Sequence, residues 1–234
     1  PSAAGRRPRA MWLAKAMSRP LTVHVWSDIA CPWCFIGKRR LEKALREFDG
    51  DVTVEYRSFE LAPDTPIDFE GSEIDFLSQF KGLPREQVRR MIEHVTAVAA
   101  GEGLHYDFGA LRHTRTLLAH QALHHAKAHG RQLELAERLF QAYFEQGRHL
   151  GRVAELAALA AEVGLDPEET RRVLTEGTYS RAVADDVDAA RRLGIRGVPC
   201  FVIDDRYAVS GAQDPVVLLE ALRRAARDRV ATGG

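Results

Sequence analysis

Two cysteines separated by two residues, Cys31 and Cys34, have the spacing in this sequence that is most suited to chemistry. An apolar run at residues 21–26 precedes them, and residues 35–45 follow with the apolar spacing of a helix that packs on one face. Strand, Cys-x-x-Cys and helix in this order are typical of a redox pair. Cys31 is predicted at the helix start, where unpaired backbone N–H groups and the helix dipole favour a thiolate. We therefore expect Cys31 to be the nucleophile and Cys34 the less exposed resolving thiol.

The two residues between the cysteines fit the same interpretation. Pro32 suits the first helical position, because its φ is already helical and the N–H that it lacks would have no partner there. Pro32 and Trp33 are expected to help set the redox poise of the pair. Burial of two unreactive cysteines is the plain alternative, but a helix start is a poor place to hide both thiols.

A metal site is another use of such a pair. A structural zinc site needs two further ligands, usually a second close pair, and the only other cysteine is Cys200. A catalytic zinc bound by Cys31, Cys34 and a distant histidine stays open. His120 and His124 could share a helix face, but no third ligand is evident. We therefore expect no metal, and histidines that are solvated or at the edge of the core.

Size and composition restrict the function classes. The 234 residues can bury a substantial core, and 33 basic residues balance 33 acidic ones, so no nucleic acid is expected as partner. No apolar run approaches the ~20 residues that a membrane crossing needs. Residues 1–19 are expected to be a disordered extension or a cloning remnant, with Met17 a plausible natural start. They contain no export signal, which predicts a cytoplasmic protein in which a Cys-x-x-Cys is catalytic.

The rest of the sequence predicts two strand-containing parts, separated by a helical part. Residues 51–59 alternate apolar and polar side chains, as a strand does. Residues 73–194 contain helical stripes and no convincing strand. Strand character returns at residues 201–203 and 206–210, and Asp214 precedes a last helix. The predicted order is β-α-β, a large helical insertion, then β-β-α.

Pro199 marks a second part of the candidate site. It follows Val198 directly before the third strand, where a proline, which cannot donate to a sheet ladder, indicates an edge or a turn. A trans bond would make it a simple strand entry. We predict a cis Val198–Pro199 bond, whose backbone could pair with an extended substrate beside Cys31. Cys200 is predicted to be a packed core residue rather than a rival thiol.

These features together resemble the DsbA family of the thioredoxin superfamily, over about residues 21–226. The resemblance implies an α/β thioredoxin-like fold with a large all-helical insertion. Residues 20–65 and 190–230 would form the discontinuous thioredoxin-like domain, and residues 66–189 the insertion domain. Several shorter motifs resemble the FrnE-like subgroup, namely Ser27-Asp28-Ile29-Ala30-Cys31-Pro32-Trp33-Cys34, Phe59-Glu60-Leu61, Thr114-Arg115 with Ala119-His120, Leu139-Phe140-Gln141-Ala142-Tyr143-Phe144, Gly197-Val198-Pro199 and Ser210-Gly211-Ala212-Gln213.

The resemblance also implies supporting residues. Glu60 and the loop that contains Ala212 and Gln213 would lie near the active site. Two positions depart from the family pattern. The family usually has Asn before the Thr-Arg pair, where this chain has His113, and often an aromatic residue or Thr after the cis-proline, where it has Cys200.

The implied activity is that of a thiol–disulfide oxidoreductase or disulfide isomerase. Its substrates would be protein or small-molecule disulfides and dithiols. Cys31 would form a mixed disulfide with the substrate, and Cys34 would resolve it. No bound cofactor is expected, although glutathione could serve as redox partner. The helical insertion could supply a homodimer face.

Two other classes remain as alternatives. Glutathione-dependent transferases of the kappa type, such as the 2-hydroxychromene-2-carboxylate isomerases, look like the same fold with the same insertion. They generally have Ser at the first active-site position and lack the second Cys, so Cys31 and Cys34 argue against them. A redox sensor or chaperone would bind according to the oxidation state of the pair, without turnover.

Overall fold

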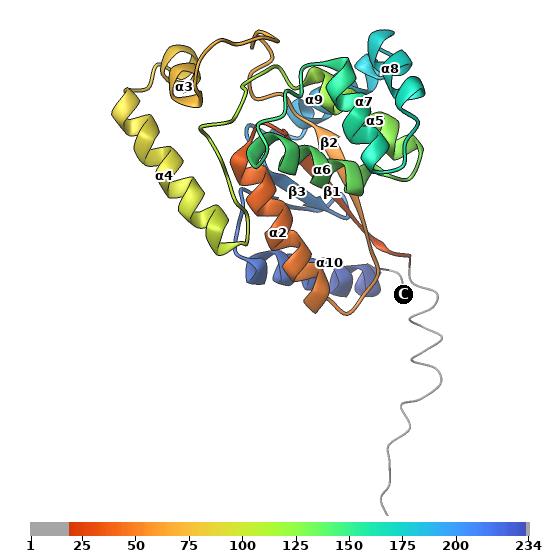
Figure 1. Cartoon of the computed structure of the whole chain (residues 1–234). Helices are drawn as coiled ribbons and strands as arrows, with labels where there is room; N and C mark the ends of the chain where they lie inside the picture. The colour runs from red at the N-terminus through yellow and green to blue at the C-terminus, as the bar shows by residue number, and fades with distance from the viewer. Residues whose placement is uncertain (1–18, 233–234) are drawn as a thin grey trace, which may run out of the picture.

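Four strands form a mixed sheet at the centre of the molecule (Figure 1), in the order β2-β1-β3-β4. Strand β1 (Leu21–Ser27) runs parallel to β2 (Val52–Ser58) and antiparallel to β3 (Cys200–Ile203). Strand β3 in turn pairs antiparallel with β4 (Tyr207–Ser210). Each strand lies where the sequence predicts it, and the order of elements is that of the expected thioredoxin-like α/β fold.

This computed structural model describes residues 19–232. The predicted N-terminal extension, residues 1–19, therefore lies almost wholly outside the described residues. Within the described part, no helix combines the length and the apolar character that a membrane crossing requires.

One face of the sheet carries the main core. Strand side chains alternate between the faces, so Val23, Val25 and Phe201 point to the same side. They pack there against helix α2 (Pro32–Glu47) and helix α10 (Pro215–Thr232). Because a shift of one residue would turn this apolar set toward the other face, the pattern fixes the register of the sheet.

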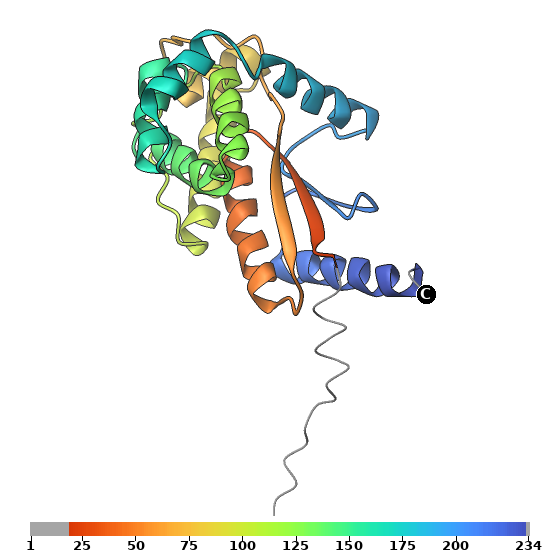
Figure 2. The same ribbon diagram turned by 90° about the vertical axis from the view of Figure 1, so that its right-hand side faces the viewer.

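The other face carries a smaller cluster. Trp26 and Cys200 are paired across β1 and β3, and both pack with Ala190 of helix α9 (Ser180–Arg192). The indole Nε1 of Trp26 donates to the main-chain oxygen of Asp186, 3.1 Å away. Figure 2 shows α9 and α2 on opposite sides of the strands.

The chain between β2 and β3 is helical, as predicted. Its helices begin where local signals favour them: Ser72 makes a reciprocal capping box with Asp75, and the Asp166 side chain caps Glu168 and Glu169. The bounds, apart from α9 above, are α3 Glu73–Lys81, α4 Arg85–Gly101, α5 Leu117–Ala128, α6 Gln132–Phe144, α7 Val153–Glu162 and α8 Pro167–Thr175.

Helix α6 joins the insertion to the strand-containing part. Eight of its side chains are buried, and the ring of Phe140 stacks on Phe35 of α2, with 5.0 Å between ring centroids. Both side chains are fully buried. The helices of the insertion and the main face of the sheet therefore share one hydrophobic core.

Helices α3 and α4 form an arm that projects to one side of the molecule (Figure 1). Helix α4 buries only Val88, Val95 and Ala99, and its other side chains are exposed or half-buried. The arm is held mainly by contacts between α3 and α4 and by contacts of α4 with α2. It flanks the start of α2, where the two cysteines lie.

Candidate active site

The two cysteines lie at the start of α2, as predicted. Cys31 is the N-cap residue and Pro32 occupies the first turn. The Cys31 N–H donates to the carbonyl of Asp28 (3.1 Å), and the Cys34 N–H donates to the carbonyl of Cys31 (3.0 Å). Both thiols are free, and both residues are buried, Cys31 being 5% and Cys34 2% exposed. Cys31 therefore lies at the boundary of the helix, and Cys34 lies within its first turn.

The Val198–Pro199 peptide bond is cis, as predicted, and it adjoins the cysteines. The Cys31 thiol donates a weak hydrogen bond to the carbonyl oxygen of Val198, with 3.6 Å between sulfur and oxygen. On the other side, the N–H of Gly211 donates to the carbonyl of Pro199, 2.8 Å away. The loop that precedes β3 is thus held between the first cysteine and the end of β4.

Burial keeps the thiol of Cys34 protonated. The pKa of Cys34 is raised well above 9.0, first by burial and then by its hydrogen bond to Cys31 and the charge of that residue. Tyr106 contributes a hydroxyl nearby, which donates to the carbonyl of Pro32 at 2.6 Å. Burial also raises the pKa of Tyr106 far above its usual range, so this hydroxyl keeps its proton. Because its pKa is raised, Cys34 is a protonated thiol at neutral pH.

A cavity of about 370 Å³ adjoins the cysteine pair. Cys31, Pro32 and Trp33 form one part of its lining, and helices α3 and α4 form another. The indole of Trp33 is half-buried and lies 6.0 Å from the imidazole of His94 on α4, measured between ring centroids. A volume of this size is typical of sites for small molecules.

A buried carboxylate lies at the same place, just after β1. Asp28 accepts hydrogen bonds from the N–H groups of Leu61 (2.8 Å) and Ala30 (3.2 Å), and its Oδ1 lies 3.4 Å from Nε2 of His120. Burial alone would raise the pKa of Asp28, but His120 and the backbone donor of Leu61 lower it more, so the net shift is downward. Asp28 is therefore an ionised group that lines the cavity.

A second buried pair lines the cavity on the side of α3. Glu73, the first residue of α3, lies with an oxygen 2.7 Å from Nδ1 of His113. With the carboxylate oxygen of Glu73 as the acceptor, Nδ1 of His113 donates in this contact. His113 is the residue that departs from the family pattern, and the fold brings it to the cavity next to the cysteine pair.

Three other residues considered in the sequence analysis, Glu60, Gln213 and Cys200, do not line the cavity beside Cys31. Leu61, beside Glu60, does line the cavity. The carboxylate of Glu60 accepts a hydrogen bond from Nε of Arg115 at 3.1 Å. Gln213 turns back on its own loop, where its amide donates to the carbonyl of Ser210 at 2.9 Å. Cys200 packs on the opposite face of the sheet from Phe201, as expected for a core residue.

The histidines correct one expectation. His124 is half-buried and His129 exposed, as expected for solvated or core-edge histidines, but His120 and His125 are each 1% exposed and His113 is 5% exposed. The helical stripe of α5 indicates that His120 and His125 face inward, but His113 lies in the segment before α5 and has no such signal. The sequence also does not show which acid the fold brings to each ring. Asp28 belongs to the motif around the cysteines that the sequence shows, whereas its contact with His120 depends on the folded insertion.

One group elsewhere has the geometry of metal ligands. Ligand atoms of His125, His129 and Glu169 all lie within 4.8 Å of one another, on α5, its C-cap and α8. None of the three lines the cavity beside Cys31. The expectation that the cysteine site works without a metal stays a prediction.

Known proteins resemble this chain over nearly its whole length. The protein YwbO of Bacillus subtilis (strain 168), described as uncharacterized, is 31% identical over 206 residues, which are 86% of this chain and 96% of that protein. The crystal structure of a probable DsbA oxidoreductase from Streptomyces coelicolor is 40% identical, with a TM-score of 0.82 over 88% of this chain and 89% of that one.

A more distant structure shares the fold alone. The cytosolic disulfide reductase DsbM from Pseudomonas aeruginosa, solved with GSH, is 21% identical, with a TM-score of 0.61 over 91% of this chain and 98% of that one.

A family model described as a DSBA-like thioredoxin domain matches residues 22–223. This match, together with the cysteine pair, the cis-proline and the sheet topology, shows that the chain belongs to the family of DSBA-like thioredoxin domains.

Proposed function

We propose that this protein is a thiol–disulfide oxidoreductase of the FrnE-like subgroup that uses Cys31 and Cys34 as its redox pair. One observation carries the proposal: Cys31 is the N-cap residue of α2, its sulfur lies 3.6 Å from the carbonyl oxygen of Val198, and it lines a cavity that a substrate could enter. Pro32 and Trp33 would tune the pair, and Glu60 and Gln213 would support the surrounding loops.

The reaction begins with the deprotonated sulfur of Cys31. It attacks one sulfur of a substrate disulfide, so a Cys31–substrate disulfide forms and the other substrate sulfur leaves as a thiolate. Cys34 then loses its proton and attacks the sulfur of Cys31, which releases the second substrate thiolate. The protein has given two electrons, and a Cys31–Cys34 disulfide remains. The reverse sequence oxidises a dithiol, and repetition without net oxidation isomerises disulfides.

The cellular setting is part of the same proposal. We place the protein in the cytoplasm, acting on protein or small-molecule disulfides and dithiols, with glutathione as redox partner rather than as a bound cofactor. No nucleic acid or membrane is needed for this activity. The helical insertion would supply the face of a homodimer.

The first experiment is to measure the reduction potential of the pair. The purified protein is equilibrated with glutathione buffers and its free thiols are trapped and counted. We expect a reversible two-electron couple that involves Cys31 and Cys34. If no disulfide forms over the accessible range, the proposal is wrong and a glutathione-dependent isomerase becomes the better explanation.

Two variants assign the roles of the cysteines. Cys31→Ala should abolish dithiol exchange, because the attacking sulfur is lost. Cys34→Ala should still attack and therefore accumulate mixed disulfides with substrate, visible by mass spectrometry. Full insulin reduction by Cys31→Ala would contradict the assignment.

A further inference from the structure

The walls of the cavity beside Cys31 are mainly apolar. The side chains that give it this character come from the arm, from the active-site turn and from the segment after α4, namely Trp33, Phe76, Leu77, Met91, Val95 and Phe108. Charged side chains also line the cavity, namely Asp28, Glu73 and Lys81, but Asp28 and Glu73 already have partners and most of the wall is apolar. A highly charged ligand would therefore lose more hydration than these groups replace. The walls therefore suit an apolar body rather than the charged backbone of a peptide such as glutathione.

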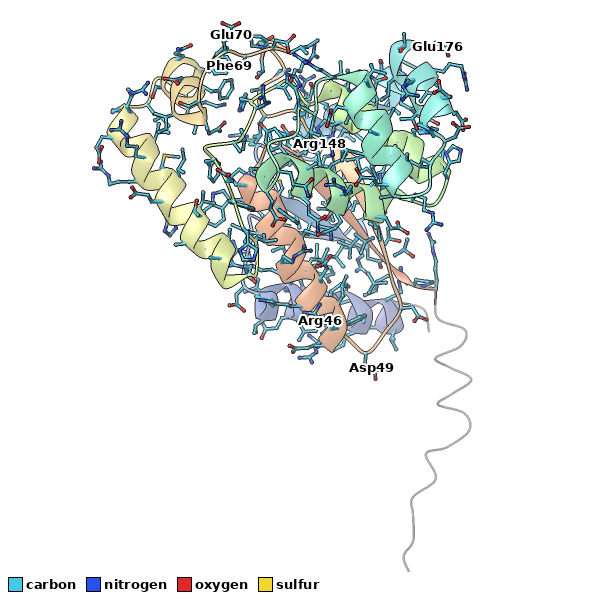
Figure 3. The ribbon with its side chains drawn as sticks, viewed as in Figure 1. Arg46, Asp49, Phe69, Glu70, Arg148 and Glu176 are labelled. Atoms are coloured by element: carbon cyan, nitrogen blue, oxygen red, sulfur yellow. The ribbon has the colours of Figure 1, made fainter. Side chains whose placement is uncertain are left out.

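The Glu73–His113 pair is a polar element in this apolar wall. Glu73 is 8% and His113 5% exposed, and the His113 ring lies against Phe76 with 3.4 Å between centroids. Phe69, on the segment that leads into α3 (Figure 3), packs edge-on against the same ring. Aromatic contacts on the ring and the bond to Glu73 hold the imidazole in one orientation.

This orientation leaves one ring nitrogen for a ligand. Nδ1 of His113 donates to Glu73, so Nε2 is the nitrogen that remains. A hydroxyl group suits Nε2 in either protonation state, because a hydroxyl can both donate and accept. A carboxylate suits it less, because the carboxyl group of Glu73 already lies against the same ring.

We infer that the cavity binds a small apolar disulfide or thiol that carries a hydroxyl group, with its sulfur at Cys31 and its hydroxyl at Nε2 of His113. This inference rests on the proposed function of the cysteine pair and names its substrate class. Electrons follow the path given above: the reduced pair supplies two electrons, and each half of the disulfide leaves as a thiol. A single turnover of reduced protein needs no further reductant.

The test uses two aryl disulfides of the same shape, bis(4-hydroxyphenyl) disulfide and bis(4-methylphenyl) disulfide. Stopped-flow measurement gives the rate of thiol release from reduced protein, divided by the rate with a free thiol to remove intrinsic reactivity. A site built to bond a hydroxyl discriminates against the methyl analogue. We expect the hydroxyl probe to react about five- to tenfold faster after this correction.

Variants then test the role of His113 as a specificity residue. His113→Phe keeps a flat ring but removes Nε2, so the ratio of the two probe rates should fall to about one. Glu73→Gln keeps an acceptor for Nδ1 and should retain most of the ratio. Because each ratio is taken within one protein, a general loss of activity cancels.

Filling the cavity gives an independent test. Leu77→Trp should slow both aryl probes relative to cystamine, a small charged disulfide that does not need the apolar walls. Leu133→Trp on α6 is the matched control, since Leu133 is exposed and does not line the cavity. It should leave all rates unchanged.

The outcomes separate the inference from the proposed function. Equal corrected rates for the two aryl probes, with cystamine and insulin still reduced, would overturn the inference and leave the redox function standing. A ratio that persists in His113→Phe would overturn the role of His113. Failure of wild-type protein with every disulfide would overturn the proposed function itself.

Discussion

Gly37 and Pro199 approach each other so closely that there is no room for a side chain at position 37. A Cβ on Gly37 would lie 2.9 Å from Cγ of Pro199 and 3.2 Å from the ring of Phe201. Gly37 lies in the second turn of α2, and Pro199 follows the cis bond beside Cys31. This contact therefore sets how closely the cysteine helix approaches the loop before β3.

Gly37→Ala should destabilise the protein, although alanine normally favours a helix. The proline ring cannot rotate away, so the added methyl group must move α2 or the loop, at a cost of about 1–3 kcal/mol. Urea unfolding measures the loss, and the reduction potential should shift with it. Gly101→Ala is the control: Gly101 ends α4 with open space around it, and the change should be neutral or slightly stabilising. Equal stabilities of the two variants would contradict the steric argument.

The two thiols should differ in reactivity with iodoacetamide. Burial and the neighbouring Cys31 raise the pKa of Cys34 well above 9.0, so Cys34 is protonated at neutral pH and its thiolate forms only in strongly alkaline solution. In the reduced protein we expect alkylation at Cys31 first, located by peptide mass mapping. In Cys31→Ser, burial still holds the pKa of Cys34 up, and alkylation should remain slow up to about pH 9. Rapid labelling of Cys34 at neutral pH would disprove this.

Asp28→Asn should destabilise the protein in a pH-dependent way. The pKa of Asp28 is lowered from 3.8 on folding, so ionised Asp28 stabilises the native state above that pH, and the contribution disappears as pH falls through the folded pKa. An asparagine at position 28 leaves a buried donor without its acceptor, which costs about 1–3 kcal/mol near neutral pH.

Urea unfolding of wild type and Asp28→Asn over a pH series checks this. The gap between them should be full near neutral pH and should narrow below about pH 4. Asp68→Asn is the matched control, because the Asp68 carboxylate also has a lowered pKa, through Arg152, but is exposed to solvent. It should change stability little at any pH, since exposed ion pairs contribute little. A constant gap for Asp28→Asn would contradict the linkage.

Cys200→Ala should leave the redox chemistry unchanged. Cys200 packs with Trp26 and Val202 on the face of the sheet that α9 covers, and burial raises the pKa of its thiol. We expect wild-type reduction potential and turnover, with a stability loss of about 1 kcal/mol from the lost packing. A changed potential would mean that Cys200 takes part in exchange with Cys31.

The cysteine site could be predicted because its parts follow local rules. The strand, the Cys-x-x-Cys spacing and the first-turn proline are read within residues 21–45, and Val198–Pro199 is recognised from its place before a strand. The alternation of apolar and polar side chains predicted the strands, because one face of each strand must be buried. These features need no knowledge of how the insertion folds.

The acid–histidine contacts could not be predicted for the opposite reason. Glu73 and His113 are 40 residues apart, and Asp28 and His120 lie in different parts of the chain. A helical stripe shows which face of a helix is buried, but it does not identify the element against which that face packs. The interpretation of His120 as a core-edge residue was wrong: the ring is 1% exposed, and a polar ring is tolerated at this depth because Asp28 lies 3.4 Å away.

The thinly packed arm of α3 and α4 forms one wall of the cavity and differs in local stability from the core that supports the cysteine helix. Helix α4 buries three side chains, whereas α6, which packs against the cysteine helix α2, buries eight. Regions with few buried contacts open without global unfolding, so amide hydrogens of α4 should exchange with solvent well before those of α6. The arm could thus admit and release an apolar molecule through brief local opening, while the reactive sulfurs stay fixed on the rigid part of the fold.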